Sequence, residues 1–174
     1  MHTRQWIGTY GNRGNDNYQG ELASALQAIK TYLAHFALPP EAALVRLDGQ
    51  YGDAVVIAQL LEAGVNLITR GRTYRMLEYP QLQRVLTHPP STRVTALTTG
   101  EVVELFDGGW LDLDEGLPQV RVIVARHAAP PPGKKVRVGK RIGEWGYELF
   151  ITTWPVDGVL LEDAPSLVSW TWSL

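Results

Sequence analysis

The sequence contains no cysteine, so disulfide frameworks, thiol nucleophiles and cysteine metal sites are excluded. Long apolar runs are also missing, because no uncharged stretch approaches the roughly 18–20 residues of a bilayer span and the first residues lead into no signal-peptide core. A strong excess of one charge is missing too, since 16 basic residues nearly balance 18 acidic ones. We therefore expect a cytoplasmic protein without a membrane partner and without the overall basic charge typical of nucleic-acid-binding proteins.

The chain has 174 residues, of which 45% are hydrophobic and 20% charged, as in a globular protein. This length predicts one compact domain, or one domain with an inserted lobe. The charges are unevenly distributed, because every charged residue from Glu101 to Glu115 is acidic and every one from Arg121 to Arg141 is basic. The near-neutral sum therefore hides two opposed charged regions.

Two helices are predicted in the first third of the chain. Apolar residues recur at three- and four-residue steps over residues 21–36, which predicts an amphipathic helix that ends before Pro39. A second, shorter helix is predicted over residues 54–63. Asp53 is its expected N-cap, far more readily than a metal ligand, and Gly64 is its expected terminator.

Mostly apolar strands are predicted on both sides of the second helix, over residues 42–47 and 65–69. A strand-helix-strand unit nearly always pairs its two strands in parallel, and ligands of such units bind beyond the carboxyl ends of the strands. Asp48 and Arg70 follow these two ends. We therefore expect both side chains on one rim of the sheet.

The second half of the chain is predicted to be rich in antiparallel strands. A polar segment over residues 72–90 favours a short helix, and the later strands are then separated by Gly and Pro, including Gly108-Gly109. The strands are expected over residues 93–97, 102–106, 120–125, 136–138 and 147–153.

Several passages resemble DDE insertion-sequence transposases, whose catalytic domain has a ribonuclease H-like fold. The passages are Leu44-Val45-Arg46-Leu47-Asp48-Gly49-Gln50-Tyr51-Gly52, Ala63-Gly64-Val65-Asn66-Leu67-Ile68-Thr69-Arg70-Gly71, and the strand Tyr147-Glu148-Leu149-Phe150-Ile151-Thr152-Thr153. The first two are similar to the region around the second catalytic aspartate of the family. The β-rich stretch over residues 93–153 is similar to the insertion that these enzymes carry before their last catalytic helix, and residues 3–12 are similar to the opening of one branch.

The resemblance implies an α/β fold, with an incomplete ribonuclease H-like strand-helix-strand core and an inserted antiparallel β subdomain. It divides the chain into a partial core over residues 1–90, the insertion over residues 91–154 and an atypical tail over residues 155–174. It also implies that Asp48 is a catalytic, metal-binding carboxylate. Mg²⁺ or Mn²⁺ would be the cofactor, the DNA of transposon ends would be the partner, and a homo-oligomer is a further expectation.

The family uses three carboxylates, and only the second is matched here. Asp16 and Asp53 are the aspartates near the expected first position, and neither lies on a predicted strand. Glu162 and Asp163 are poor substitutes for the third acid, because no Arg or Lys follows Arg141. We therefore expect a fragment of a transposase catalytic domain that is inactive alone.

Two groups of basic residues are candidate DNA ligands. Arg70, Arg72 and Arg75 follow the second strand and could grip phosphates, although a solvated loop explains them equally well. The second group lies on a predicted hairpin, where it could follow a DNA backbone or pair with the acidic hairpin over residues 101–115. It consists of Lys134, Lys135, Arg137, Lys140 and Arg141.

Two other functions remain open at this point. One is a non-catalytic module that binds DNA or protein through the basic hairpin over residues 134–141. The other is an ordinary α/β fold that binds a small ligand at the rim formed by Asp48 and Arg70, and in the simplest interpretation Asp48-Gly49 only makes a turn.

Overall fold

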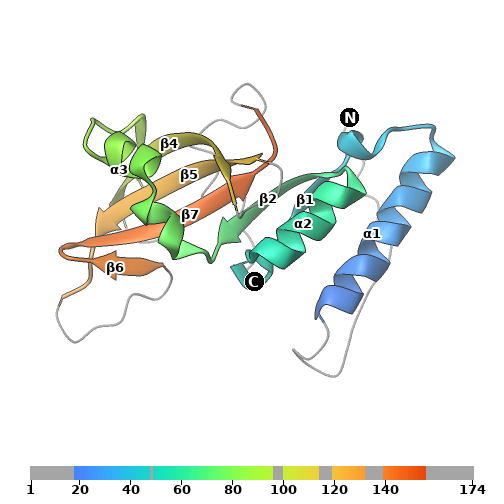
Figure 1. Cartoon of the computed structure of the whole chain (residues 1–174), viewed down its shortest axis with the longest axis horizontal. Helices are drawn as coiled ribbons and strands as arrows, with labels where there is room; N and C mark the ends of the chain where they lie inside the picture. Colours follow the sequence, from blue (N-terminus) through green and yellow to red (C-terminus); the bar gives the residue numbers. More distant parts are fainter. Residues whose placement is uncertain (1–17, 48, 96–99, 114–118, 132–138, 156–174) are drawn as a thin grey trace.

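The computed structural model describes residues 18–47, 49–95, 100–113, 119–131 and 139–155. Helices α1 and α2 lie at one end of the molecule, and β4, β5, β7 and α3 lie at the other (Figure 1). In chain order, the elements are α1 (Tyr18–His35), the 3-10 helix η2 (Pro40–Ala42), β1 (Leu44–Arg46), the 3-10 helix η3 (Gly49–Tyr51), α2 (Ala54–Ala63), β2 (Asn66–Gly71), the 3-10 helix η4 (Tyr74–Glu78), α3 (Pro80–Leu86), β3 (Thr92–Thr95), β4 (Val102–Asp112), β5 (Gln119–Ala128), β6 (Lys140–Ile142) and β7 (Trp145–Thr152).

Within the described ranges, seven strands form one mixed sheet in the order β1-β2-β7-β5-β4-β3, with β6 also beside β7. The strands β1 and β2 are parallel, as the strand-helix-strand pattern predicts. All other pairs are antiparallel, as expected for the second half of the chain. Because β7 pairs with β2, the parallel unit and the antiparallel strands share one sheet. The chain is therefore a mixed α/β protein, and its division into residues 1–90, 91–154 and 155–174 stays a prediction.

Helix α2 forms where the sequence predicts it, and local signals explain both of its ends. The carboxylate of Asp53 accepts a hydrogen bond from the Val56 N–H at 3.0 Å, which caps the first turn. Gly64 has a φ of 74°, a left-handed conformation that ends the helix at low cost. Between them, Ile57 and Leu60 are fully buried. The predictions for Asp53 and Gly64 are confirmed.

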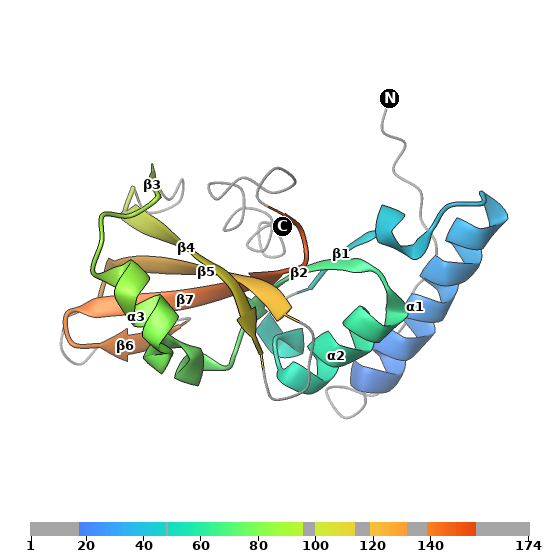
Figure 2. The same cartoon turned by 45° about the horizontal axis from the view of Figure 1, so that its top comes forward.

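The described helices cover one face of the sheet. Leu26 of α1, Leu60 of α2 and Leu82 of α3 belong to a single apolar cluster with side chains from β4, β5 and β7. A smaller cluster on the opposite face contains Ile68 and Phe150, and none of its members comes from a described helix. Figure 2 shows α2 below β1 and β2, with α1 beside α2. No helix within the described ranges is long and apolar enough to cross a lipid bilayer.

The prediction that Gly108-Gly109 separates two strands is wrong. Strand β4 continues through both glycines to Asp112, with a shift of register against β5 between Asp107 and Trp110. Gly109 has a φ of 72°, and its N–H donates to the Asp107 carboxylate at 3.0 Å. These glycines form a β-bulge, so Glu104, Asp107 and Asp112 lie on one long strand instead of on the predicted hairpin.

The remaining predictions of secondary structure have mixed outcomes. The helical prediction for residues 72–90 is confirmed by η4 and α3. The strand expected over residues 136–138 lies outside the described residues, and the strand observed beside it is β6. Strand β7 begins two residues before the predicted start, at Trp145.

Candidate functional site

The carboxyl ends of β1 and β2 lie together, as predicted. The Leu47 N–H donates to the Ile68 carbonyl at 3.1 Å, which holds the end of β1 on β2. A methyl group added at Gly49 would touch the side chain of Arg70, with Cβ and Cδ both 3.6 Å away. The residues on either side of Asp48 are therefore held against β2, whereas Asp48 itself lies outside the described residues.

The turn after Asp48 is fixed on the last residues of β2. A Cβ atom at Gly52 would overlap the carbonyl oxygen of Arg70, so the backbone passes β2 at a distance that only glycine allows. The Arg72 N–H donates to the Gly52 carbonyl at 2.9 Å, and Arg72 Nη1 donates to the Gln50 carbonyl at 3.5 Å. Arg72 therefore stabilises the turn through these hydrogen bonds, whereas Arg75 is exposed to solvent.

Arg70 has a carboxylate partner that the sequence alone does not identify. Its Nε lies 3.0 Å from Oε2 of Glu148 on β7, and the two side chains are only 22% and 21% exposed. The Nε atom is buried beside this carboxylate, and the two groups form an ion pair. The guanidinium also lies 5.9 Å from the centre of the Phe150 ring. Arg70 is therefore a mostly buried cation, and the solvated-loop interpretation of this residue is wrong.

Burial dominates the electrostatics around Glu148. Burial raises the pKa of this carboxyl above its usual range, and the positive charge of Arg70, then of His127, offsets part of that increase. Burial also raises the pKa of the Tyr74 hydroxyl, with a further contribution from the negative charge of Glu148. His127 Nδ1 lies 3.6 Å from Oε1 of Glu101. Basic and acidic groups thus alternate from β2 across β7 and β5 to Glu101, the residue before β4.

The basic hairpin is described only in part, since Lys134, Lys135 and Arg137 lie outside the described residues. Lys140 and Arg141 lie on β6. Lys140 Nζ is 3.8 Å from the Glu78 carboxylate, in a pair whose side chains are 42% and 68% exposed. The Arg141 guanidinium donates to two backbone carbonyls. Both cations therefore remain at the surface.

The acidic residues of β4 pair with arginines on neighbouring strands. Glu104 lies 2.6 Å from Arg126 and 3.1 Å from Arg93, and the hydrogen bond from Arg126 is the main cause that holds the Glu104 pKa below its usual range. Asp107 lies 2.9 Å from the buried Arg121. The alternative prediction, in which these acids pair with the basic hairpin, is wrong for the two described hairpin residues.

The described residues do not make a metal centre on their own. Among them, no group of three or more His, Asp and Glu side chains is arranged to hold a metal ion. Glu148 is the carboxylate that accompanies Arg70, whose guanidinium lies 3.0 Å away. Asp48, to which the resemblance assigns Mg²⁺ or Mn²⁺, lies outside the described residues.

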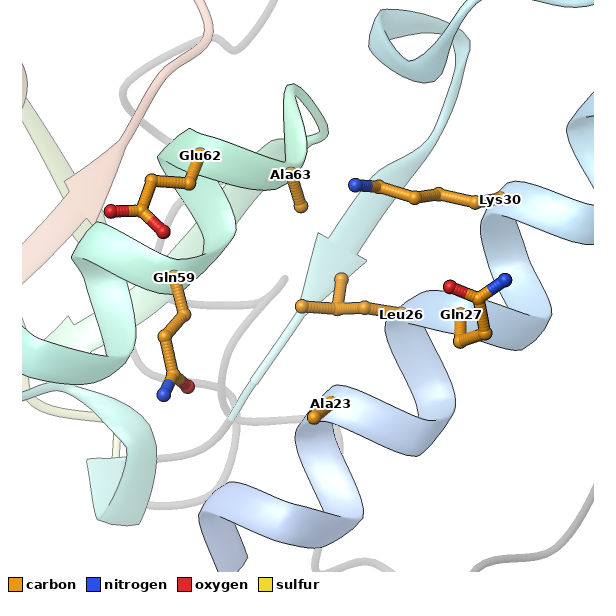
Figure 3. A pocket seen from close by; sticks show the side chains of 7 residues that line it. All are labelled: Ala23, Leu26, Gln27, Lys30, Gln59, Glu62 and Ala63. Atoms are coloured by element: carbon orange, nitrogen blue, oxygen red, sulfur yellow. The ribbon is translucent and has the colours of Figure 1, made fainter.

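A separate hollow lies between α1 and α2 (Figure 3). Figure 3 shows Leu26 pointing from α1 across the gap, with Lys30 beside it, whereas Glu62 of α2 points away from Lys30. The Oε1 atom of Gln59 is buried there and has no hydrogen-bond partner among the described residues. None of the residues predicted from the sequence to act in binding or catalysis lines this hollow.

Comparison with known proteins gives no family for this chain. No protein-family model matches it, and no curated protein matches its sequence significantly. Its function must therefore be argued from its own residues.

Sequence reasoning placed Arg70 correctly at the rim but assigned no role to Glu148 or Tyr74. The signal for Glu148 was present, because it is an acid within the otherwise apolar run Tyr147-Glu148-Leu149-Phe150-Ile151. A carboxylate on a buried strand requires a cationic partner. The sequence did not identify that partner, because the pairing of β7 with β2 was not predicted.

Proposed function

We propose that this chain is the part of a DDE transposase catalytic domain that surrounds its second aspartate, with Asp48 as that residue. The parallel pairing of β1 with β2 carries the proposal. It brings residues 47 and 49 against Ile68 and Arg70, so the chain on both sides of Asp48 lies at the carboxyl ends of two parallel strands. Functional side chains of open α/β sheets gather at such ends. In this proposal the sheet is a ribonuclease H-like core extended by inserted strands.

The chemistry of the proposal needs both an acid and a cation at this rim. A Mg²⁺ or Mn²⁺ ion held partly by Asp48 would stabilise negative charge on a phosphodiester during cleavage and strand transfer. Arg70 would bind a phosphate oxygen of the same DNA strand through its guanidinium. One carboxylate cannot hold the two ions of such a site, so the chain alone is expected to bind DNA without cleaving it.

The test measures DNA binding with and without divalent ions at equal ionic strength. In EDTA, the Asp48 carboxylate should repel the phosphates, so Asp48→Asn should tighten binding of a short duplex by roughly threefold to tenfold. Mg²⁺ should tighten binding of the unaltered chain and leave Asp48→Asn unchanged. Fluorescence anisotropy provides the dissociation constants.

Asp53→Asn is the matched control, because it removes a nearby carboxylate and keeps an oxygen that can cap α2. It should behave as the unaltered chain does. If Asp48→Asn and Asp53→Asn respond alike to EDTA and Mg²⁺, Asp48 does not lie at the bound phosphate and the proposal fails.

A catalytic test adds the missing acids. An upstream strand ending in Asp and a downstream helix carrying Tyr, Arg and Glu, fused to this chain, should produce Mg²⁺-dependent nicking. Asp48→Ala should abolish it. Nicking that survives this substitution would refute the role of Asp48.

A second candidate is a non-catalytic module that binds DNA or protein through the basic hairpin over residues 134–141. The surface position of Lys140 and Arg141 favours it, because neither charge is neutralised by the acids of β4. In this case, replacing all five basic residues by Ala should flatten the salt dependence of DNA binding.

The control for this candidate is the pair Lys30→Ala and Arg84→Ala, which removes exposed cations from α1 and α3. It should leave the salt dependence nearly unchanged, and so should Asp48→Ala. DNA binding that is absent at low salt contradicts both candidates that bind DNA.

A further inference from the structure

The mostly buried pair of Arg70 and Glu148 joins two strands that are far apart in the sequence. Arg70 is opposite Phe150 in the register of β2 and β7, and Glu148 is the diagonal neighbour on the same face of the sheet. Their side chains meet at 3.0 Å through Nε of Arg70. Holding two charges there costs desolvation, so the pair is not explained by stability alone.

Glu148 contacts the guanidinium of Arg70 along one edge only. The Nε atom of Arg70 is buried beside Glu148, and the aliphatic stem of Arg70 lies under Gly49. The side chain keeps 22% exposure. Because Nε is the atom buried beside Glu148, the two Nη groups are the part of the guanidinium left to contact a ligand. The stem of Arg70 lies at the rim where the turn over residues 49–52 crosses β2.

We propose that Glu148 is a positioning residue, which holds Arg70 by its Nε edge and thereby directs the two Nη groups toward a DNA phosphate at the carboxyl ends of β1 and β2. The proposal rests on the proposed function of this rim. Its physical basis is the planar fork of the guanidinium, which can bind one carboxylate along one edge and an oxyanion along another. Glu148 itself does not touch the DNA.

Two substitutions of Glu148 distinguish this role from simple charge compensation, because one shortens the side chain and the other removes its charge. Glu148→Asp keeps the negative charge but is one methylene shorter, so it cannot approach Nε in the same way. Glu148→Gln keeps the length and an acceptor oxygen but loses the charge. If positioning is the role, Glu148→Asp should disable Arg70 and Glu148→Gln should preserve it.

The experiment measures how much Arg70 contributes to DNA binding in each background, as the effect of Arg70→Gln on the dissociation constant of a short duplex. In the unaltered chain and in Glu148→Gln, Arg70→Gln should weaken binding roughly tenfold and lower the salt slope by about 0.9. In Glu148→Asp, the same substitution should weaken binding by less than roughly threefold, because Arg70 is no longer directed toward the phosphate. Circular dichroism and urea unfolding of each variant show that it is folded under the binding conditions.

Two outcomes overturn the inference while the proposed function survives. The effect of Arg70→Gln could be equal in the Glu148→Asp and unaltered backgrounds, or Glu148→Gln could be the variant that removes it. DNA binding that is absent in the unaltered chain at low salt, or that Arg70→Gln leaves unchanged, overturns the inference together with the phosphate contact of Arg70 in the proposed function. The unaltered chain and Arg70→Gln therefore distinguish the two failures.

Discussion

Among the described residues, Arg121 has the largest fully buried side chain, and replacing it by Met should destabilise the protein strongly. Its side chain is 1% exposed, and its Nη2 and Nε lie 2.9 and 3.4 Å from the two carboxylate oxygens of Asp107. Its Nη1 also donates to the Pro155 carbonyl at 3.2 Å, just after the end of β7. Arg121→Met therefore leaves a carboxylate and a carbonyl without their shared donor.

The magnitude follows from the burial of the pair. Breaking a buried ion pair by removing one partner typically costs about 3–5 kcal/mol. Asp107 is 23% exposed and keeps its hydrogen bond from the Gly109 N–H, so we expect the lower end, about 3 kcal/mol. Removing both charges with Arg121→Met and Asp107→Leu should recover part of this loss, since neither charge is then left unpaired.

Urea unfolding followed by far-UV circular dichroism measures these free energies. The matched control is Arg93→Met, which breaks the ion pair of a 60% exposed arginine with Glu104 and should cost less than about 1 kcal/mol. If Arg121→Met costs no more than Arg93→Met, burial does not make the Arg121 pair important and the reasoning is refuted.

Three further predictions concern the rim and its supports. Gly52→Ala should cost about 1–3 kcal/mol in urea unfolding because its Cβ would overlap the Arg70 carbonyl, whereas Gly49→Ala makes only ordinary contacts and should cost less than about 1 kcal/mol; equal costs would contradict this. Asp53→Ala should cost about 0.5–2 kcal/mol through loss of the α2 cap, and Asp53→Asn much less. Because burial raises the pKa of Glu148 in the folded state, this group's contribution to stability is lost as the pH rises through that pKa. Urea unfolding at increasing pH values above 4.5, the ordinary pKa of a glutamate, should show this loss in the unaltered chain and not in Glu148→Gln, and identical pH profiles would disprove it.

The strand-helix-strand unit was determined by the sequence itself, because its signals are local. A capping Asp53, a left-handed Gly64 and apolar residues at helical spacing lie within a few residues of the structure they specify. The parallel pairing of β1 with β2 then follows from the short connection between them. This was enough to place Arg70 at the correct rim.

Only the tertiary structure decided which distant strands meet. The pairing of β7 with β2 brings Glu148 to Arg70, and no local pattern in either strand specifies that neighbour. The same holds for Gly108, which looks like a turn residue in the sequence but lies inside β4. Glycine is needed there for close packing, because an added Cβ would overlap Leu82 of α3 and lie 2.8 Å from the Val122 carbonyl oxygen. Glycine can permit a turn or a close approach, and which one occurs depends on what packs against it.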